Sequence, residues 1–334
     1  MDPLDTTLLP AGIRSRMVPE VNGLTMHVLE AGQAGRPVLL LLHGFPELAF
    51  SWRRVMLPLA EAGFHVIAPD QRGYGRTGGP KGEAAIPQYD IAHLTADLDG
   101  MMTALGLEKA IFCGHDWGGM VVWQMALRYP ERVAGVIGVN TPFIPRAPMD
   151  PIQLMCAAMG DDMYIVFFQK YGVAEKLFEA DIAKSMRFWY RKSGMTLAQY
   201  DALPESDKKL ALVQAFQRPE SEWPGEQLLD KEEMAYYVDA FTRSGFEGGI
   251  NWYRNFTRNW QDSADLKEHV AVPCLMISAA DDIVLRPEMT EGMEKYVPDL
   301  EKHIIADCGH WTQAEKPQEL NRLMVDWLKR RFAS

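Results

Sequence analysis

Short apolar runs and amphipathic stretches alternate along most of the chain. Several of the apolar runs contain no polar residue, as expected for parallel strands that are covered on both faces. The runs that predict strands are residues 24–30, 38–42, 65–68, 110–113, 133–139, 274–278 and 303–305. The stretches with helical spacing are residues 52–62, 91–105, 120–129, 287–297 and 317–332. This alternation predicts an α/β fold with a mostly parallel, doubly wound sheet.

The alternation stops between residues 141 and 263. This stretch is rich in Met, Phe, Tyr and Trp and predicts helices without clear strands. It begins directly after a predicted strand, where α/β folds carry functional loops. We therefore expect a helical cap at 141–263, inserted between two parts of an α/β core at 1–140 and 264–334.

A tight turn at Gly114-His115-Asp116-Trp117-Gly118-Gly119 joins a predicted strand to a predicted helix. Hydrolytic enzymes with a G-x-S-x-G motif carry their nucleophilic serine on a turn of this kind. Here Asp116 occupies the position of the serine, and a carboxylate needs no base to activate it at neutral pH. Its attack on a saturated carbon gives an ester, which water cleaves, whereas a serine would give a stable ether. Asp116 therefore indicates a substrate with an electrophilic saturated carbon.

Candidate catalytic partners follow Asp116 in the order acid, then histidine. Enzymes that carry their nucleophile on such a turn have their catalytic triad in this order along the chain. The strand at 274–278 leads to Asp281 and Asp282, and the strand at 303–305 leads to His310. Adjacent aspartates point in different directions, so the order alone leaves both open as the acid. We expect His310 to act as a general base that the acid orients.

The segment His43-Gly44-Phe45-Pro46-Glu47 follows the strand at 38–42. A loop at this place supplies one backbone N–H to an oxyanion hole, and the residue after the nucleophile supplies the other. The expected donors are Phe45 and Trp117. Pro46 lacks an N–H and is a candidate for a cis peptide bond.

The chain resembles the soluble epoxide hydrolase family, most closely the hydrolase domain of its mammalian members. The segments that carry the resemblance are His43-Gly44-Phe45-Pro46-Glu47, Asp70-Gln71-Arg72-Gly73-Tyr74-Gly75, Gly114-His115-Asp116-Trp117-Gly118-Gly119, Asn140-Thr141-Pro142-Phe143, Ser244-Gly245-Phe246, Asn251-Trp252-Tyr253-Arg254-Asn255 and Asp307-Cys308-Gly309-His310-Trp311. The resemblance implies the α/β-hydrolase fold with a helical cap. The chain has no room for the second, phosphatase domain of the mammalian proteins.

The resemblance also implies roles for single residues. Two cap tyrosines of the family hydrogen-bond the epoxide oxygen, and the matching positions are Tyr164 and Tyr253. The family pattern selects Asp282 as the acid. The chain departs from the pattern at Ile165, where mammalian members have glutamine, and at Tyr171, where proline is usual. We expect both residues at the edge of the pocket, where they would affect the range of substrates.

Composition narrows the classes of partner that we expect the protein to bind. The formal net charge of −11 argues against nucleic acid and anionic membranes. No apolar run approaches the ~20 residues that span a bilayer, and no signal-peptide pattern is present, so we expect a cytoplasmic protein. The four cysteines form no C-x-x-C pair, and Cys113 and Cys274 are expected to be buried thiols. No cofactor or metal motif is found.

The sequence therefore predicts an epoxide hydrolase that acts on small hydrophobic epoxides with water, and it leaves the oligomeric state open. One alternative is a haloalkane dehalogenase with the same Asp–His–Asp triad, although Phe45 stands where many of those enzymes carry asparagine. Another is a ligand-binding protein on a hydrolase scaffold. Absence of turnover on a broad panel of epoxides would favour the latter.

Overall fold

A computed structural model describes residues 8–332. Its centre is an eight-stranded sheet in the order β1-β2-β4-β3-β5-β6-β7-β8. The strands are β1 (Arg14–Val21), β2 (Leu24–Ala31), β3 (Val38–Leu42), β4 (His65–Pro69), β5 (Ala110–His115), β6 (Val133–Val139), β7 (Cys274–Ala279) and β8 (Leu300–Ile305). The strand pairs β1–β2 and β2–β4 are antiparallel, and the other pairs are parallel. The predicted α/β-hydrolase fold with a mostly parallel sheet is confirmed.

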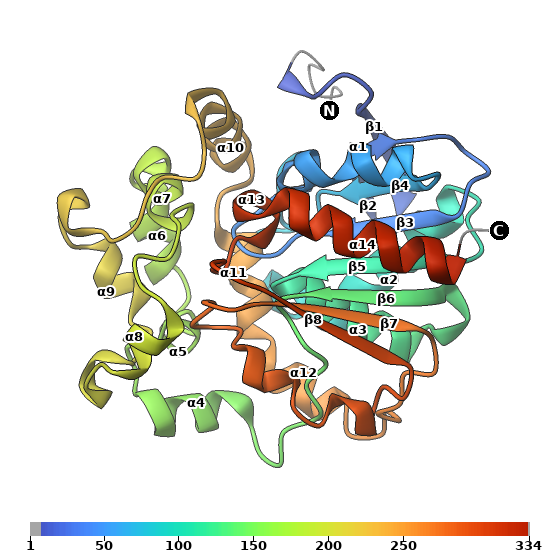
Figure 1. Cartoon of the computed structure of the whole chain (residues 1–334). Coiled ribbons are helices and arrows are strands. Elements are labelled where there is room, and N and C mark those ends of the chain that lie inside the picture. The colour runs from blue at the N-terminus through green and yellow to red at the C-terminus, as the bar shows by residue number, and fades with distance from the viewer. Residues whose placement is uncertain (1–7, 333–334) are drawn as a thin grey trace.

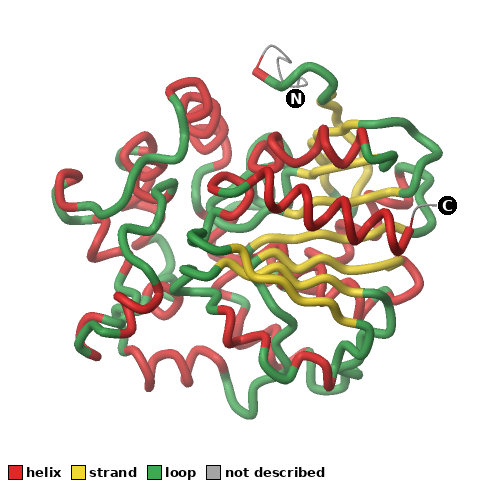
Figure 2. Tube along the Cα trace, viewed as in Figure 1, coloured by secondary structure: helices red, strands yellow, loops and turns green. Residues whose placement is uncertain are grey.

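Helices cover both faces of the sheet (Figures 1 and 2). On one face, α1 (Arg53–Glu61) packs against the C-terminal α14 (Pro317–Phe332). On the other face, α2 (Ile91–Ala104) packs against α3 (Trp117–Arg128). Because both faces are covered, the central strands are mostly apolar, and every residue of β5 is buried.

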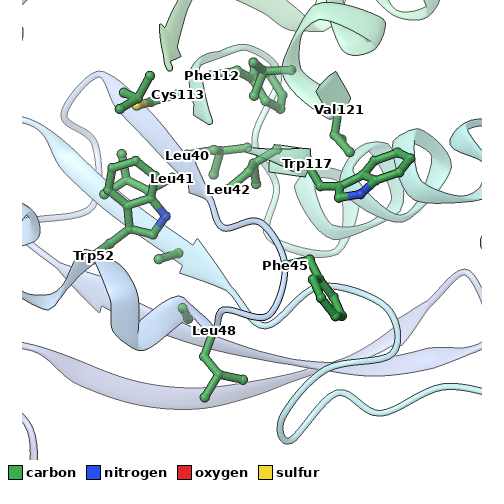
Figure 3. Packing of buried hydrophobic residues seen from close by; sticks show 14 of the residues in the cluster. Leu40, Leu41, Leu42, Phe45, Leu48, Trp52, Phe112, Cys113, Trp117 and Val121 are labelled. Atoms are coloured by element: carbon green, nitrogen blue, oxygen red, sulfur yellow. The ribbon is translucent and has the colours of Figure 1, made fainter. Parts of the chain in front are cut away.

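Buried apolar side chains of β3 and β5 pack together at the centre of the core. Figure 3 shows Leu40, Leu41 and Leu42 of β3 together with Phe112 and Cys113 of β5. All five side chains are fully buried, and Cys274 is buried as well, so the prediction for Cys113 and Cys274 is confirmed. These strands form a rigid base for the loops that follow their carboxyl ends.

Residues 140–273, all of which the structure describes, contain helices and one isolated β-bridge between Arg191 and Gln227, but no strand. The α-helices are α4 (Pro151–Met159), α5 (Tyr164–Phe167), α6 (Val173–Glu179), α7 (Ile182–Trp189), α8 (Leu197–Asp201), α9 (Leu212–Phe216), α10 (Lys231–Ser244), α11 (Glu247–Arg254) and α12 (Phe256–Asp262). In Figure 1, α4 to α10 form a separate layer on the left, beyond one end of the strands. We propose the domain division 1–140, 141–263 and 264–334, of which residues 1–7 and 333–334 lie outside the described part.

Two predictions of local structure are wrong. The edge strand β1 was missed because most of its residues are exposed or only half buried, so its sequence lacks a clear apolar run. The helix expected at 287–297 is instead two short 3₁₀ turns, Pro287–Thr290 and Met293–Lys295. Gly292 separates them with a φ of 76°, a left-handed conformation that ends a helix.

Among residues 8–332, no helix combines the length and apolar character that crossing a membrane requires.

The position of the core leads to a prediction about stability. Ile137 in β6 is fully buried, whereas Ile304 in the edge strand β8 is 61% exposed. Replacing Ile137 by alanine should lower the free energy of unfolding by roughly 2–5 kcal/mol, because it leaves a cavity. The same change at Ile304 should cost less than about 0.5 kcal/mol. Urea denaturation measures both, and equal losses would contradict this placement of the core.

Candidate active site

Asp116 lies between β5 and α3 with a φ of 51°. This conformation is unfavourable for a residue with a Cβ, so it persists only where the surrounding packing holds it. The packing is close: a Cβ on Gly118 would lie 2.1 Å from the carbonyl oxygen of Leu42, at the end of β3. The elbow therefore needs glycine at position 118, and it presents the Asp116 carboxylate at the carboxyl edge of the sheet.

The loop after β3 closes over Asp116. The N–H of Phe45 donates a hydrogen bond of 2.8 Å to Asp116 Oδ1, and the N–H of Trp117 also hydrogen-bonds this carboxylate. A Cβ on Gly44 would lie 2.3 Å from Asp116 Oδ1, so only glycine allows this approach. The Phe45–Pro46 bond is cis. The two backbone donors expected from the sequence, Phe45 and Trp117, thus both bind the carboxylate of the candidate nucleophile.

The structure brings His310, Asp282 and Asp116 together. His310 Nδ1 donates to Asp282 Oδ2 at 2.9 Å, and His310 Nε2 lies 3.7 Å from Asp116 Oδ2. The neighbouring Asp281 points elsewhere and accepts a hydrogen bond from the N–H of Leu197 in the cap. The geometry therefore separates the two aspartates that the order of residues left open.

The charges of these groups depend on one another. Burial by itself would lower the pKa of His310, but the charge and hydrogen bond of Asp282, with Asp116 and Glu47, raise it to about 9. Burial raises the pKa of Asp116, and the nearby His310 only partly offsets this effect. Burial also opposes ionisation of Asp282, but His310 and three further hydrogen-bond donors hold its pKa well below the usual range.

Tyr164 and Tyr253 come from different cap helices, α5 and α11, and line one cavity together with Asp116. Their rings contact each other with centroids 5.8 Å apart. Burial, and next the negative charge of Asp116, raise the pKa of both phenols. Both side chains therefore stay neutral and able to donate a hydrogen bond. Tyr200 is the other cap tyrosine that lines this cavity among residues 8–332.

The cavity has a volume of about 810 Å³. It is mostly apolar near Asp116, and its methionines offer a flexible surface to a hydrophobic ligand. These methionines are Met120, Met155, Met159, Met163 and Met289. Ile165 also lines it, as expected. Tyr171 does not: its hydroxyl donates to Glu247 at the surface, and Arg254 covers its ring, so its predicted place at the pocket edge is wrong.

One buried network was not assigned from the sequence. His115 Nε2 donates to the His310 carbonyl at 2.6 Å, and its Nδ1 lies 2.8 Å from Glu47 Oε2. Glu47 also accepts hydrogen bonds from the N–H of Gly44 and from Gln313. Both nitrogens of His115 thus face an oxygen atom, and these contacts fix the orientation of the ring between the Glu47 carboxylate and the His310 carbonyl. Glu47 belongs to the loop motif and His115 to the elbow motif, and these positions were the signal in the sequence that could have revealed the network.

Among residues 8–332, no three His, Cys, Asp or Glu side chains are grouped so that they could hold a metal ion.

The charge balance leads to a prediction about His310. Because the Asp116 carboxylate raises the pKa of His310, replacing Asp116 by asparagine should lower this pKa below about 9. Nitrogen-15 NMR of the imidazole rings measures it, with His310→Gln to assign the signal. Asp281→Asn is the matched control and should leave the pKa unchanged, because Asp281 faces Leu197. Equal shifts in both variants would contradict the described site.

Comparisons with known proteins agree with the fold. A family described as "alpha/beta hydrolase fold" matches residues 37–317. Bifunctional epoxide hydrolase 2 of Sus scrofa is 40% identical over 92% of this chain, which spans only 54% of the porcine protein. Epoxide hydrolase A of Mycobacterium tuberculosis is 39% identical, and the match covers 95% of this chain and 98% of that protein.

Solved structures give the same result. Epoxide hydrolase A from Mycobacterium thermoresistibile has a TM-score of 0.83 at 40% identity, covering 95% of this chain and 98% of the other. An epoxide hydrolase from Vigna radiata has a TM-score of 0.82 at 33% identity, covering 96% and 98%. On these matches over nearly the whole chain, the protein belongs to the epoxide hydrolase family of the α/β-hydrolase fold.

Proposed function

We propose that this protein converts small hydrophobic epoxides to vicinal diols through an ester formed on Asp116. The observation that carries the proposal is the placement of Asp116, Tyr164 and Tyr253 around one apolar cavity. An epoxide needs both a nucleophile for carbon and donors for oxygen as its ring opens. The names of the relatives, which are epoxide hydrolases, support the same reaction.

In the first half of the reaction, Asp116 Oδ2 attacks an epoxide carbon. Oδ1 is held by the N–H of Phe45, so Oδ2 is the oxygen left to react. The new C–O bond forms as the epoxide C–O bond breaks, and negative charge develops on the epoxide oxygen. Tyr164 and Tyr253 donate hydrogen bonds to that oxygen, and one of them supplies its proton.

In the second half, His310 removes a proton from water, and the resulting hydroxide attacks the carbonyl carbon of the ester. The negative charge then moves to Oδ1, which accepts a hydrogen bond from the N–H of Phe45. The N–H of Trp117, which binds the same carboxylate, adds to this stabilisation. The bond between Asp116 Cγ and Oδ2 breaks, and Oδ2 leaves with the diol after taking the proton on His310. The proton that remains on the new Asp116 carboxyl then passes to His310, which restores the free site. Asp282 stabilises the cationic His310 during these steps.

Esterification also adjusts His310 for this role. A base must be neutral, but the free site holds the pKa of His310 at about 9. When Asp116 becomes an ester it loses the charge that helps to raise this pKa. His310 therefore gives up its proton more readily in the ester than in the free enzyme. This proton restores the tyrosine that protonated the epoxide oxygen, and His310 is then neutral for the following step.

The reaction uses side chains and water, without a cofactor. All four cysteines are free thiols, which suits the reducing cytoplasm, the location that we propose. The alternative of a haloalkane dehalogenase uses the same triad but assigns no role to the two tyrosines, because halide leaves without a proton. The two activities can therefore be separated by changing these tyrosines.

Tyr164→Phe and Tyr253→Phe each remove one donor and keep the ring. Each change should slow ester formation on an epoxide by roughly 10–1000-fold, the order seen when one donor to a developing oxyanion is lost. The double variant should nearly abolish epoxide opening. Stopped-flow quenching of tryptophan fluorescence follows ester formation, and diol and halide release are measured on matched epoxide and haloalkane substrates.

Tyr236→Phe is the control, because Tyr236 is a buried cap tyrosine that stacks on Phe50 outside the cavity. Circular dichroism checks that each variant keeps its cap folded. Epoxide opening at the parent rate by the double variant would contradict the tyrosine assignment. If the parent protein releases halide efficiently and the double variant releases it at the same rate, the alternative activity is established.

A further inference from the structure

Asn140 is a fully buried polar residue that the proposed reaction does not use. It lies directly after β6 and adopts a φ of 61°, a left-handed conformation that asparagine tolerates better than most residues. Its backbone N–H donates to the carbonyl oxygen of Ile277 in β7. Burying an amide in a strained conformation at the carboxyl ends of the strands costs free energy unless its side chain is hydrogen-bonded.

The amide side chain of Asn140 joins the loops that carry the acid and the base. Its Nδ2 donates to Asp282 Oδ2 at 2.7 Å and lies 3.2 Å from the carbonyl oxygen of His310. Its Oδ1 accepts a hydrogen bond of 2.6 Å from Thr312 Oγ1. The partners of Nδ2 are a carboxylate and a carbonyl, which only accept, so the orientation of the amide is determined by its neighbours.

Asn140 and His310 donate to the same atom, Asp282 Oδ2. The other oxygen, Oδ1, accepts from the N–H groups of Val284 and Leu285. We propose that Asn140 is a positioning residue, which aligns the Asp282 carboxylate with His310 and weakens the hold of that carboxylate on the His310 proton. It touches neither Asp116 nor the cavity, so it acts through the acid–base pair.

The direction of the effect follows from the shared oxygen. A hydrogen bond from Asn140 partly neutralises the charge on Oδ2, so less of that charge attracts the cationic ring of His310. Without the amide, Asp282 should hold the proton on His310 more tightly. The other charged or titratable groups that face this pair are Asp116, Glu47, His115, Tyr164, Cys308 and Glu315. None of them is altered in the variants that follow.

Three variants test the proposal. Asn140→Gly removes the amide and allows the positive φ without strain. Asn140→Asp keeps the shape of the side chain. The new carboxyl group would lie about as close to Asp282 as the amide does, so the two carboxyl groups should share one proton. The protonated group then donates a hydrogen bond as the amide did. Asn22→Gly is the matched control, because Asn22 has a φ of 48° and donates to the carboxylate of Asp97, in a separate network.

Two readouts distinguish a positioning role from a structural one. The first is the pKa of His310 by nitrogen-15 NMR, which requires no substrate. It should rise in Asn140→Gly, stay near the parent value at neutral pH in Asn140→Asp, and remain unchanged in Asn22→Gly. The second is single-turnover kinetics with an epoxide, which separates ester formation from ester hydrolysis.

This kinetic part rests on the proposed function. In Asn140→Gly, ester hydrolysis should slow by roughly tenfold or more, the order expected for losing a hydrogen bond to a charged group. Ester formation should change little, so alkyl-enzyme accumulates. Asn140→Asp should recover most of the hydrolysis rate at neutral pH and lose it as the shared proton leaves at higher pH.

An unchanged or lowered pKa of His310 in Asn140→Gly would overturn the proposal, as would an equal slowing of both half-reactions. If circular dichroism shows that Asn140→Gly does not fold, Asn140→Asp decides: a hydrolysis rate without the additional loss at high pH would overturn the proposal. If the parent turns over no epoxide, the proposed function fails, and the NMR titration still decides on Asn140.

Discussion

The site depends on the close contact between the Asp116 elbow and the strands on either side of it. Asp116, at the end of β5, has a left-handed φ of 51°. The Leu42 carbonyl leaves no room for a Cβ at Gly118, and the Asp116 side chain leaves none at Gly44. This contact is what brings the N–H of Phe45 to 2.8 Å from the Asp116 carboxylate. The strain at one residue is therefore balanced by the packing of the central sheet, and the base, the acid and the cap are arranged around that residue.

Electrostatics links the parts that the elbow brings together. Asp116, Asp282 and Glu47 are buried carboxylates, and all three raise the pKa of His310. The ring of His115 lies beside that of His310, with the two centroids 4.9 Å apart. Because the charges are so close and so poorly solvated, a change on one residue alters the others. Loss of charge on Asp116 during the proposed reaction would thus reach His310 directly, without any movement of the backbone.

Much of the fold and of the candidate site could be predicted from the sequence, because both depend on local patterns. The apolar strands β3 to β7 and the elbow around Asp116 are of this kind. The order of residues left Asp281 and Asp282 both open, and only the family pattern selected Asp282. The physical difference between them is that one carboxylate faces His310 and the other faces Leu197. The bridging contacts of Asn140 join residues more than 140 positions apart in the chain, and the surface position of Tyr171 depends on how the cap packs. No single segment encodes such contacts.

The central claim is that water attacks the ester at the Asp116 carbonyl and not the epoxide carbon. One turnover in heavy-oxygen water, with enzyme in excess over epoxide, tests it directly by mass spectrometry of the digested protein and of the diol. The account predicts heavy oxygen in the peptide that contains Asp116 and none in the first diol, because the ester oxygen that leaves with the product comes from the carboxylate. Heavy oxygen in the diol, with none in the peptide, would contradict the account.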